Sequence, residues 1–161
     1  MVNILRSIPF VILMFFLIPF TRAIVGTSIG ATAALVPLSI SAAPFIARMV
    51  EQSLEEIDQG VVEAAVCMGA TRWQVITRVL LVESVPSLLR GLSISLITIL
   101  GYTAITGTVG AGGLGNIAYR FGFQRYQKDV MYAILVILIA LVCIIQIIFD
   151  TAARRADKRN R

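Results

Sequence analysis

Four long uncharged stretches, each rich in apolar residues, dominate the pattern of the chain. They are residues 7–21, 23–47, 91–119 and 130–149. An α-helix needs roughly 20 apolar residues to cross the hydrocarbon core of a bilayer, and three of the stretches reach that length. The pattern predicts an all-α integral membrane helical bundle with about four transmembrane helices, at approximately 7–25, 27–48, 85–107 and 129–150. The first stretch is the shortest and holds Pro9 and Pro19, so it is the weakest span.

The segment between the second and third predicted spans, residues 50–83, is the most polar part of the chain. Apolar residues at helical spacing up to Ile57 predict that the second span continues as an amphipathic helix, with Gly60 as its stop. A short helix is expected over 61–68, and Gly69 breaks it. Thr71, with Gln74 three residues later, predicts a capping box at the start of the next helix. The expected result is a helical elbow between two spans.

Lys and Arg are unevenly divided between the two ends of the predicted bundle. Four spans place both termini on one side, which then holds ten basic residues, including those of the tail at 151–161. The other side holds four. An excess of Lys and Arg marks the cytoplasmic side of a membrane protein. We therefore predict that both termini and the elbow are cytoplasmic.

The overall composition agrees with a membrane protein and excludes several other classes. Hydrophobic residues make up 58% of the chain and charged residues 14%, against about 25% charged in soluble domains. An ordinary soluble enzyme and a disordered protein are therefore excluded. The sequence contains no His, which excludes His-based metal sites and general bases. It also lacks the G-x-x-x-x-G-K-[ST] loop, so energy for any transport must come from a partner or a gradient.

One glycine pattern imitates a cofactor motif. Gly110, Gly112 and Gly115 match G-x-G-x-x-G, the dinucleotide fingerprint. That motif requires a preceding strand and a βαβ unit, whereas here a membrane-length apolar run precedes it. We expect a turn or a broken helix near the end of a span instead.

Small and polar residues form a stripe along the third predicted span. Gly91, Ser95, Thr98, Tyr102 and Thr106 follow one another at spacings of three or four and share one helical face. Such a stripe either lines a translocation path or lets helices pack closely, and both interpretations stay open. No ionisable residue lies in the middle of a span, which counts against a proton-coupled carrier.

The elbow also carries a recognisable motif. Glu63-Ala64-Ala65, followed after three residues by Gly69, resembles the EAA loop of bacterial ABC importer permeases. Val79 and Leu81 stand where that loop has Ile and Leu, while Val82 replaces its Pro. The stretches 7–10, 18–22, 43–51 and 110–115 resemble the permease subunit of methionine-uptake ABC transporters, and the resemblance covers essentially the whole chain.

This resemblance implies a fold and a function. It implies a type I importer permease forming a single domain over 1–161, which imports D- or L-methionine across the bacterial inner membrane. The residues that would couple it to an ATPase are Glu63, Ala64, Ala65, Gly69, Val79 and Leu81. The chain itself would be no enzyme and would hold no cofactor or metal, because ATP and Mg²⁺ belong to a separate subunit. The implied partners are two ATPase copies, a second permease copy, a substrate-binding lipoprotein and membrane lipid. Family members usually carry a further N-terminal span.

Two alternatives come from other classes. Ala65, Gly69 and Val75 also fit the spacing of a helix-turn-helix, as in a membrane-anchored DNA-binding regulator. Between Glu63 and Glu83, however, the only basic residues are two arginines, whereas DNA affinity needs several Lys or Arg facing phosphates. We therefore predict no nucleic-acid partner. The second alternative is a structural membrane subunit without transport.

Overall fold

Three long helices form the body of the protein. The computed structural model describes residues 8–157, and within that range the regular elements are all helical. The long helices are α4 (Ala31–Glu55), α7 (Leu81–Thr106) and α9 (Lys128–Ala156). Each belongs to a helical stretch long and apolar enough to cross a membrane. The predicted all-α membrane bundle is therefore confirmed, with three membrane-length stretches among the described residues.

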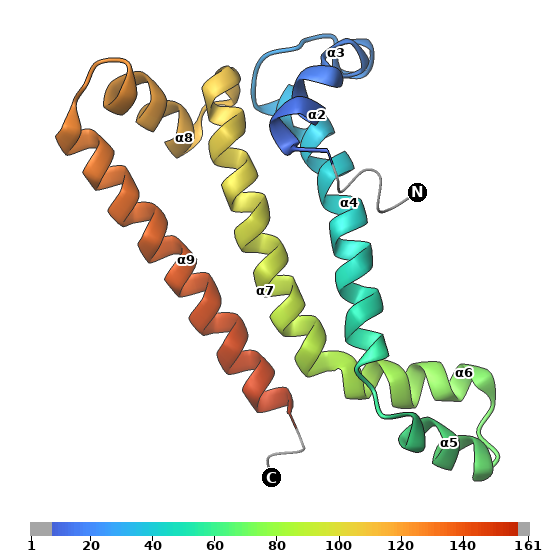
Figure 1. Ribbon diagram of the computed structural model, residues 1–161. Coiled ribbons are helices and arrows are strands. Elements are labelled where there is room, and N and C mark those ends of the chain that lie inside the picture. Colours follow the sequence, from blue (N-terminus) through green and yellow to red (C-terminus); the bar gives the residue numbers. More distant parts are fainter. Residues whose placement is uncertain (1–7, 158–161) are drawn as a thin grey trace.

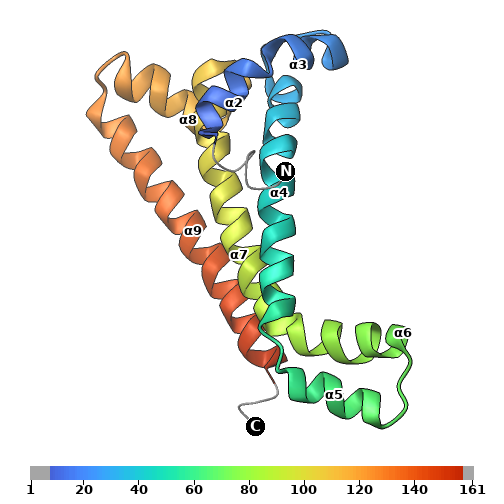
Figure 2. The ribbon, with the colours of Figure 1, turned by 45° about the vertical axis from the view of Figure 1, so that its right-hand side comes forward.

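The middle helix of the body is α7, which packs against α4 on one side and α9 on the other (Figure 1). Short helices gather at both ends of the bundle. Helices α2, α3 and α8 lie at one end, whereas α5 and α6 project from the other, where α9 also ends (Figure 2). We call the end with α5 and α6 the elbow end and the other the distal end.

The prediction of a first span at 7–25 is corrected by the structure. Residues 10–25 instead form α2 (Phe10–Phe16) and α3 (Ile18–Val25), separated at Leu17, at the distal end. At 1.5 Å per residue they are only about 10 and 12 Å long, against roughly 30 Å of hydrocarbon. Pro19 sits in the first turn of α3 and has no N–H with which to continue a helix from α2. The prediction that both termini lie on the same side as the elbow assumed four spans. With residues 10–25 not spanning, that assumption no longer supports the N-terminal part of the prediction.

The helices α4 and α7 approach closely through a glycine. A Cβ atom added to Gly91 of α7 would lie 2.7 Å from the terminal methyl of Met49 on α4. Ser95, one turn further, is buried, and its hydroxyl donates to the Gly91 carbonyl at 2.9 Å. This bond within the helix satisfies the buried Ser95 hydroxyl. The face that carries Gly91 and Ser95 is therefore a packing surface in this structure.

At the distal end the chain turns back on α7. The π-helical stretch η2 (Gly107–Ala111) leads into α8 (Gly113–Ile117) and then into η3 (Ala118–Phe123). Gly110 and Gly112 have φ of +91° and +83°, a backbone region that favours glycine. Gly115 lies so close to α7 that an added Cβ would be 2.2 Å from the Ala104 carbonyl oxygen. The turn expected from the glycine pattern is confirmed.

Candidate functional site

The elbow begins with a cap that differs from the expected one. Helix α4 ends at Glu55, and α5 runs from Gln59 to Cys67. The side chain of Asp58 caps α5 by accepting the Gly60 N–H at 2.8 Å. Gly60 therefore lies inside the first turn of α5 and does not end the preceding helix as predicted. An Asp at this position satisfies one of the N–H groups that a helix start leaves free.

The reversal between the two elbow helices is a Schellman turn around Gly69. The Ala70 N–H donates to the Ala65 carbonyl at 3.1 Å, and the Gly69 N–H donates to the Val66 carbonyl at 2.9 Å. This pair of bonds is the Schellman pattern and requires a left-handed residue after the helix. Gly69 supplies it with φ +83°. The predicted break at Gly69 is confirmed, and its cause is backbone conformation.

The return arm of the elbow starts at the predicted capping box. Thr71 accepts the Gln74 N–H through its hydroxyl, and the Gln74 side chain accepts the Thr71 N–H at 2.9 Å. Helix α6 (Arg72–Gln74) continues directly into the π-helical η1 (Val75–Leu80) and then α7. Helix α5 packs against η1, and each contributes one buried residue, Ala65 and Val75. The small Ala65 side chain lets α5 and η1 lie close together.

The base of the elbow is fixed to the body. The Ser87 hydroxyl of α7 donates to the Glu56 carboxylate at 2.5 Å and lies 3.2 Å from the buried Ser53 hydroxyl. The helical stretch formed by α6 and η1 changes direction where η1 passes into α7 (Figure 2). A π-helical turn and a proline inside a helix are two known causes of such bends, and Pro86 lies one turn into α7. The elbow is thus continuous with α7 and hydrogen-bonded to the end of α4.

The predicted coupling residues lie in two places on the elbow. Glu63, Ala64 and Gly69 are exposed on α5 and its turn, while Ala65 is buried beneath them. Val79 and Leu81 lie at the junction with α7, the first half-buried and the second exposed. We call residues 63–73, which surround the Gly69 turn, the tip of the elbow. The structure separates this tip from the junction with α7, residues 79–81.

Sequence reasoning missed the most exposed apolar residues of the elbow. Met68 and Trp73 flank the Gly69 turn, with 83% and 72% of their surface exposed, and Val66 is 57% exposed. The Gly69 turn leaves the Trp73 side chain exposed at the tip of the elbow. A cluster of exposed large apolar side chains rimmed by polar residues is typical of a protein-protein contact surface.

The four predicted path residues are not gathered around one opening. Ser95 and Thr106 are buried and donate to carbonyls of their own helix. Thr98 does the same towards the Ile94 carbonyl. Tyr102 stacks on Phe10 of α2, with ring centroids 4.4 Å apart. These contacts favour the packing interpretation within one chain, and a role in a translocation path stays a prediction.

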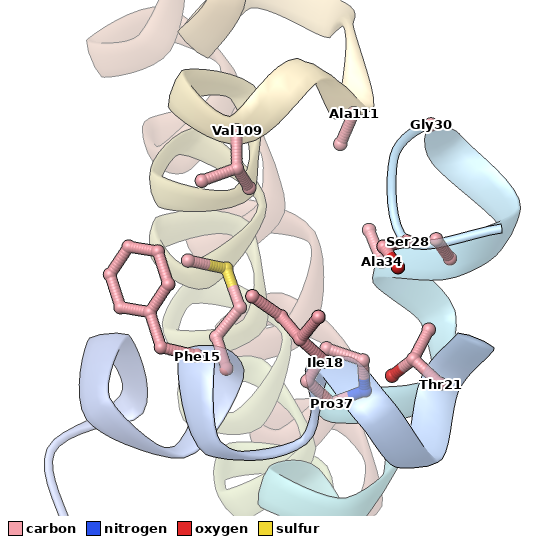
Figure 3. A pocket seen from close by; sticks show the side chains of 11 residues that line it. Phe15, Ile18, Thr21, Ser28, Gly30, Ala34, Pro37, Val109 and Ala111 are labelled. Atoms are coloured by element: carbon pink, nitrogen blue, oxygen red, sulfur yellow. The ribbon is translucent and has the colours of Figure 1, made fainter. Parts of the chain in front are cut away.

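The pockets of the chain differ in volume. The pocket in Figure 3 lies at the distal end between α2, α3, the start of α4 and η2, and its volume is about 40 Å³. Side chains of Phe15, Ile18 and Val109 point into the region from different elements. Small-molecule sites typically measure roughly 300–1,000 Å³. A larger hollow of about 340 Å³ runs along α4, α7 and α8 and includes Thr106.

A comparison with protein families decides the class of the chain. A model of the family described as "Binding-protein-dependent transport system inner membrane component" matches residues 1–161. The chain belongs to this family. It is accordingly an inner-membrane transport component, and the DNA-binding regulator is excluded as its identity. The resemblance noted in the sequence is confirmed.

Individual relatives are similar over almost the whole chain. A protein named probable D-methionine transport system permease from Vibrio cholerae is 53% identical over 158 residues, covering 98% of this chain and 70% of the relative. A methionine import system permease from Bacillus subtilis is 49% identical, covering 98% and 71%. A chain of the MetNI methionine ABC transporter, solved in inward-facing conformations, is 54% identical with a TM-score of 0.92, covering 98% of this chain and 73% of that one.

Proposed function

We propose that this chain is the membrane-spanning permease subunit of an ATP-driven methionine importer, with 1–161 acting as one permease domain. The elbow is its contact with a separate ATPase, which holds the ATP and Mg²⁺. The observation that carries the proposal is a rigid, apolar-tipped elbow continuous with a membrane-length helix. Support for the substrate and the ATPase comes from relatives about 50% identical that are named for methionine import, one within a solved ABC transporter.

The elbow suits the transmission of motion for a physical reason. ATP-driven closure takes place in a water-soluble partner, and the motion has to reach the spans through a contact that does not bend. The Schellman turn, the capping box and the Ser87–Glu56 bond fix the elbow internally and at its base. Met68 and Trp73 at the tip expose apolar surface that a partner would cover. A displacement of the tip by the partner would therefore move α7.

Charge supports an orientation with the elbow in the cytoplasm. Among the described residues, the elbow end holds six arginines: Arg48, Arg72, Arg78, Arg90, Arg154 and Arg155. The distal end holds Arg22, Arg120, Arg125 and Lys128. The excess at the elbow end follows the positive-inside rule, which supports a cytoplasmic position for the C-terminal end of α9. The N-terminal prediction falls on residues 1–7, which lie outside the described part.

The assembly we propose contains more than one chain. The hydroxyls of Ser95, Thr98 and Thr106 are turned to their own helix, so one copy provides an incomplete polar path. A second permease copy would complete it across the groove beside Thr106, with two ATPase copies below the elbows. The distal end would receive methionine from a substrate-binding lipoprotein. The remaining alternative, a structural subunit without transport, predicts no uptake.

The test is ATP-dependent uptake of labelled methionine by the chain reconstituted with its ATPase and binding protein in liposomes. Gly69→Pro should abolish both ATPase binding and uptake, since proline cannot adopt φ +83° and lacks the N–H that bonds Val66. Gly112→Pro is the matched control, because Gly112 has the same φ of +83° but lies in the distal turn. It should keep ATPase binding. Methionine uptake that needs no ATP, or normal ATPase binding by Gly69→Pro, would contradict the proposal.

A further inference from the structure

The distal end carries aromatic and basic side chains that the proposed function does not use. We call residues 119–132 the aromatic-basic segment. It contains Tyr119, Arg120, Phe121, Phe123, Arg125, Tyr126, Lys128 and Tyr132. The segment consists of η3, a short turn and the first turn of α9. Its one acidic residue is Asp129, so the segment has a net positive charge.

Backbone and ring contacts give this segment a defined shape. The Gln127 N–H donates to the Phe121 carbonyl at 3.1 Å, which folds the turn back onto η3. Gly122 packs on α9, where an added Cβ would lie 3.1 Å from the Cβ of Met131. The Arg125 guanidinium lies 4.8 Å above the centre of the Phe121 ring. The basic side chains are therefore presented from a compact turn beside the start of α9.

The basic groups of this turn have no acidic partner in the part of the chain that the structure describes. Arg120, Arg125 and Lys128 are exposed there and make no salt bridge. Tyr126 is 82% exposed and has a φ of +53°, which is uncommon for a bulky residue. Tyr132, one turn into α9, is 66% exposed. Tyr together with Lys and Arg at the end of a membrane-length helix is typical of the bilayer interface.

Two aromatic residues of the same segment line an apolar groove. It measures about 320 Å³ and lies between α7, η3 and α9, with Ala104, Thr108, Ala118, Tyr119, Phe123 and Leu138 along its walls. Tyr119 and Phe123 belong to the aromatic-basic segment and stack on each other, with centroids 5.9 Å apart. The groove thus shares Tyr119 and Phe123 with the aromatic-basic segment, and Leu138 lines it further along α9. It is open on one side, and an open groove beside a membrane-length helix lies within reach of lipid tails.

We propose that the aromatic-basic segment and this groove together bind one anionic phospholipid. The anionic headgroup, whose phosphate carries the charge, lies against Arg120, Arg125 and Lys128, and one acyl chain lies in the groove beside Tyr119 and Phe123. Charge complementarity accounts for the unpaired basic groups, and the apolar walls account for the chain. A free phosphate ion or an acidic protein surface would use the charges alone and leave the groove unexplained.

The test compares two lipids with the same acyl chains and phosphate, of which one has a net negative charge and the other is zwitterionic. The full-length chain, purified in mild detergent, is mixed with dioleoylphosphatidylglycerol or dioleoylphosphatidylcholine, and bound lipid is counted by native mass spectrometry. We expect preferential retention of phosphatidylglycerol. A juxtamembrane Lys or Arg contributes about a fivefold effect on binding to anionic lipid, so Arg120→Gln, Arg125→Gln and Lys128→Gln together should remove the preference. Arg22→Gln, an exposed cation at the same end on α3, is the matched control and should keep it.

A second variant tests the groove itself. Ala118→Phe places a large side chain in the groove without changing charge, and it should weaken retention of both lipids. Circular dichroism and size-exclusion profiles equal to those of the unmodified chain ensure that a loss of lipid reflects the site. Equal retention of both lipids by the unmodified chain would overturn the proposal. So would an equal loss in Arg22→Gln, or a triple variant that keeps the preference for phosphatidylglycerol. Methionine uptake does not enter this readout, so failure here leaves the proposed transport function untouched.

Discussion

The contact between α8 and α7 should make Gly115→Ala one of the most damaging small substitutions in this protein. The new Cβ would lie 2.2 Å from the Ala104 carbonyl oxygen and 2.7 Å from its Cα, where ordinary contact begins at 3.4 Å. Both neighbours are backbone atoms and cannot rotate away. Helix α8 would have to move by about 1 Å, and the bond from the Asn116 side-chain amide to the Gly107 carbonyl, 2.9 Å long, would stretch. Overpacking costs about 1–3 kcal/mol and a lost hydrogen bond about 1 kcal/mol, so we expect about 3 kcal/mol.

The assay is thermal unfolding of the purified chain in detergent, read by circular dichroism. A loss of about 3 kcal/mol corresponds to a fall of about 6–12 °C in Tm for a chain of this size. The matched control is Gly101→Ala on α7, where an added Cβ meets nothing within 4 Å. That substitution removes a glycine from a helix interior and should leave Tm unchanged or slightly raised. If Gly115→Ala were as stable as Gly101→Ala, the close approach of α8 to α7 would be refuted.

Two further substitutions probe the elbow and the predicted path. Asp58→Ala removes the cap of α5 and should cost about 1 kcal/mol, which hydrogen exchange would show as faster exchange confined to α5. Unchanged exchange would mean that the cap is unimportant. Tyr102→Phe keeps the stack on Phe10 and should preserve both Tm and methionine uptake, whereas Tyr102→Ala should lower Tm because aromatic pairs contribute about 0.5–1.5 kcal/mol beyond burial. Reduced uptake by Tyr102→Phe at normal Tm would instead assign its hydroxyl to the translocation path.

Much of the bundle could be predicted from local patterns. The three long apolar runs became α4, α7 and α9, because a membrane-length run has few alternatives to a helix. Thr71 and Gly69 were also assigned correctly, since a capping box and a left-handed turn depend on residues only a few positions apart. The EAA-type motif predicted the position of the elbow for the same reason, because its residues lie close together in the sequence. The left-handed turn at Gly69 then determines where the tip of the elbow lies.

Other features depend on how one residue's preference is overridden by a nearby residue or by another helix. A local sequence pattern does not predict which of them prevails. The apolar run 7–21 predicted one span over 7–25, but Pro19 in the first turn of α3 prevents a continuous helix there. Gly60 looked like a helix stop, yet Asp58 two residues earlier provides the cap that starts α5. The spacing of the stripe through Ser95 predicts a shared helical face, but its use for packing depends on Gly91 meeting Met49 of another helix. Contacts between distant elements carry no signal in a single sequence.

The most direct test of the central claim uses the two cysteines that the chain already has. Cys67 is exposed at the end of α5, beside the Gly69 turn, and Cys143 is exposed on α9 within the apolar stretch. Each is kept alone by replacing the other with Ser. The remaining thiol is labelled with a maleimide that carries a benzophenone, and the chain is assembled with its ATPase and illuminated, so that the benzophenone inserts into a C–H bond of whatever lies beside it. We predict a crosslink from Cys67 to the ATPase, with a yield that changes when ATP is added, and none from Cys143. A Cys67 variant that never crosslinks to the ATPase, or a crosslink equally strong from Cys143, would contradict the assignment of the elbow as the coupling site.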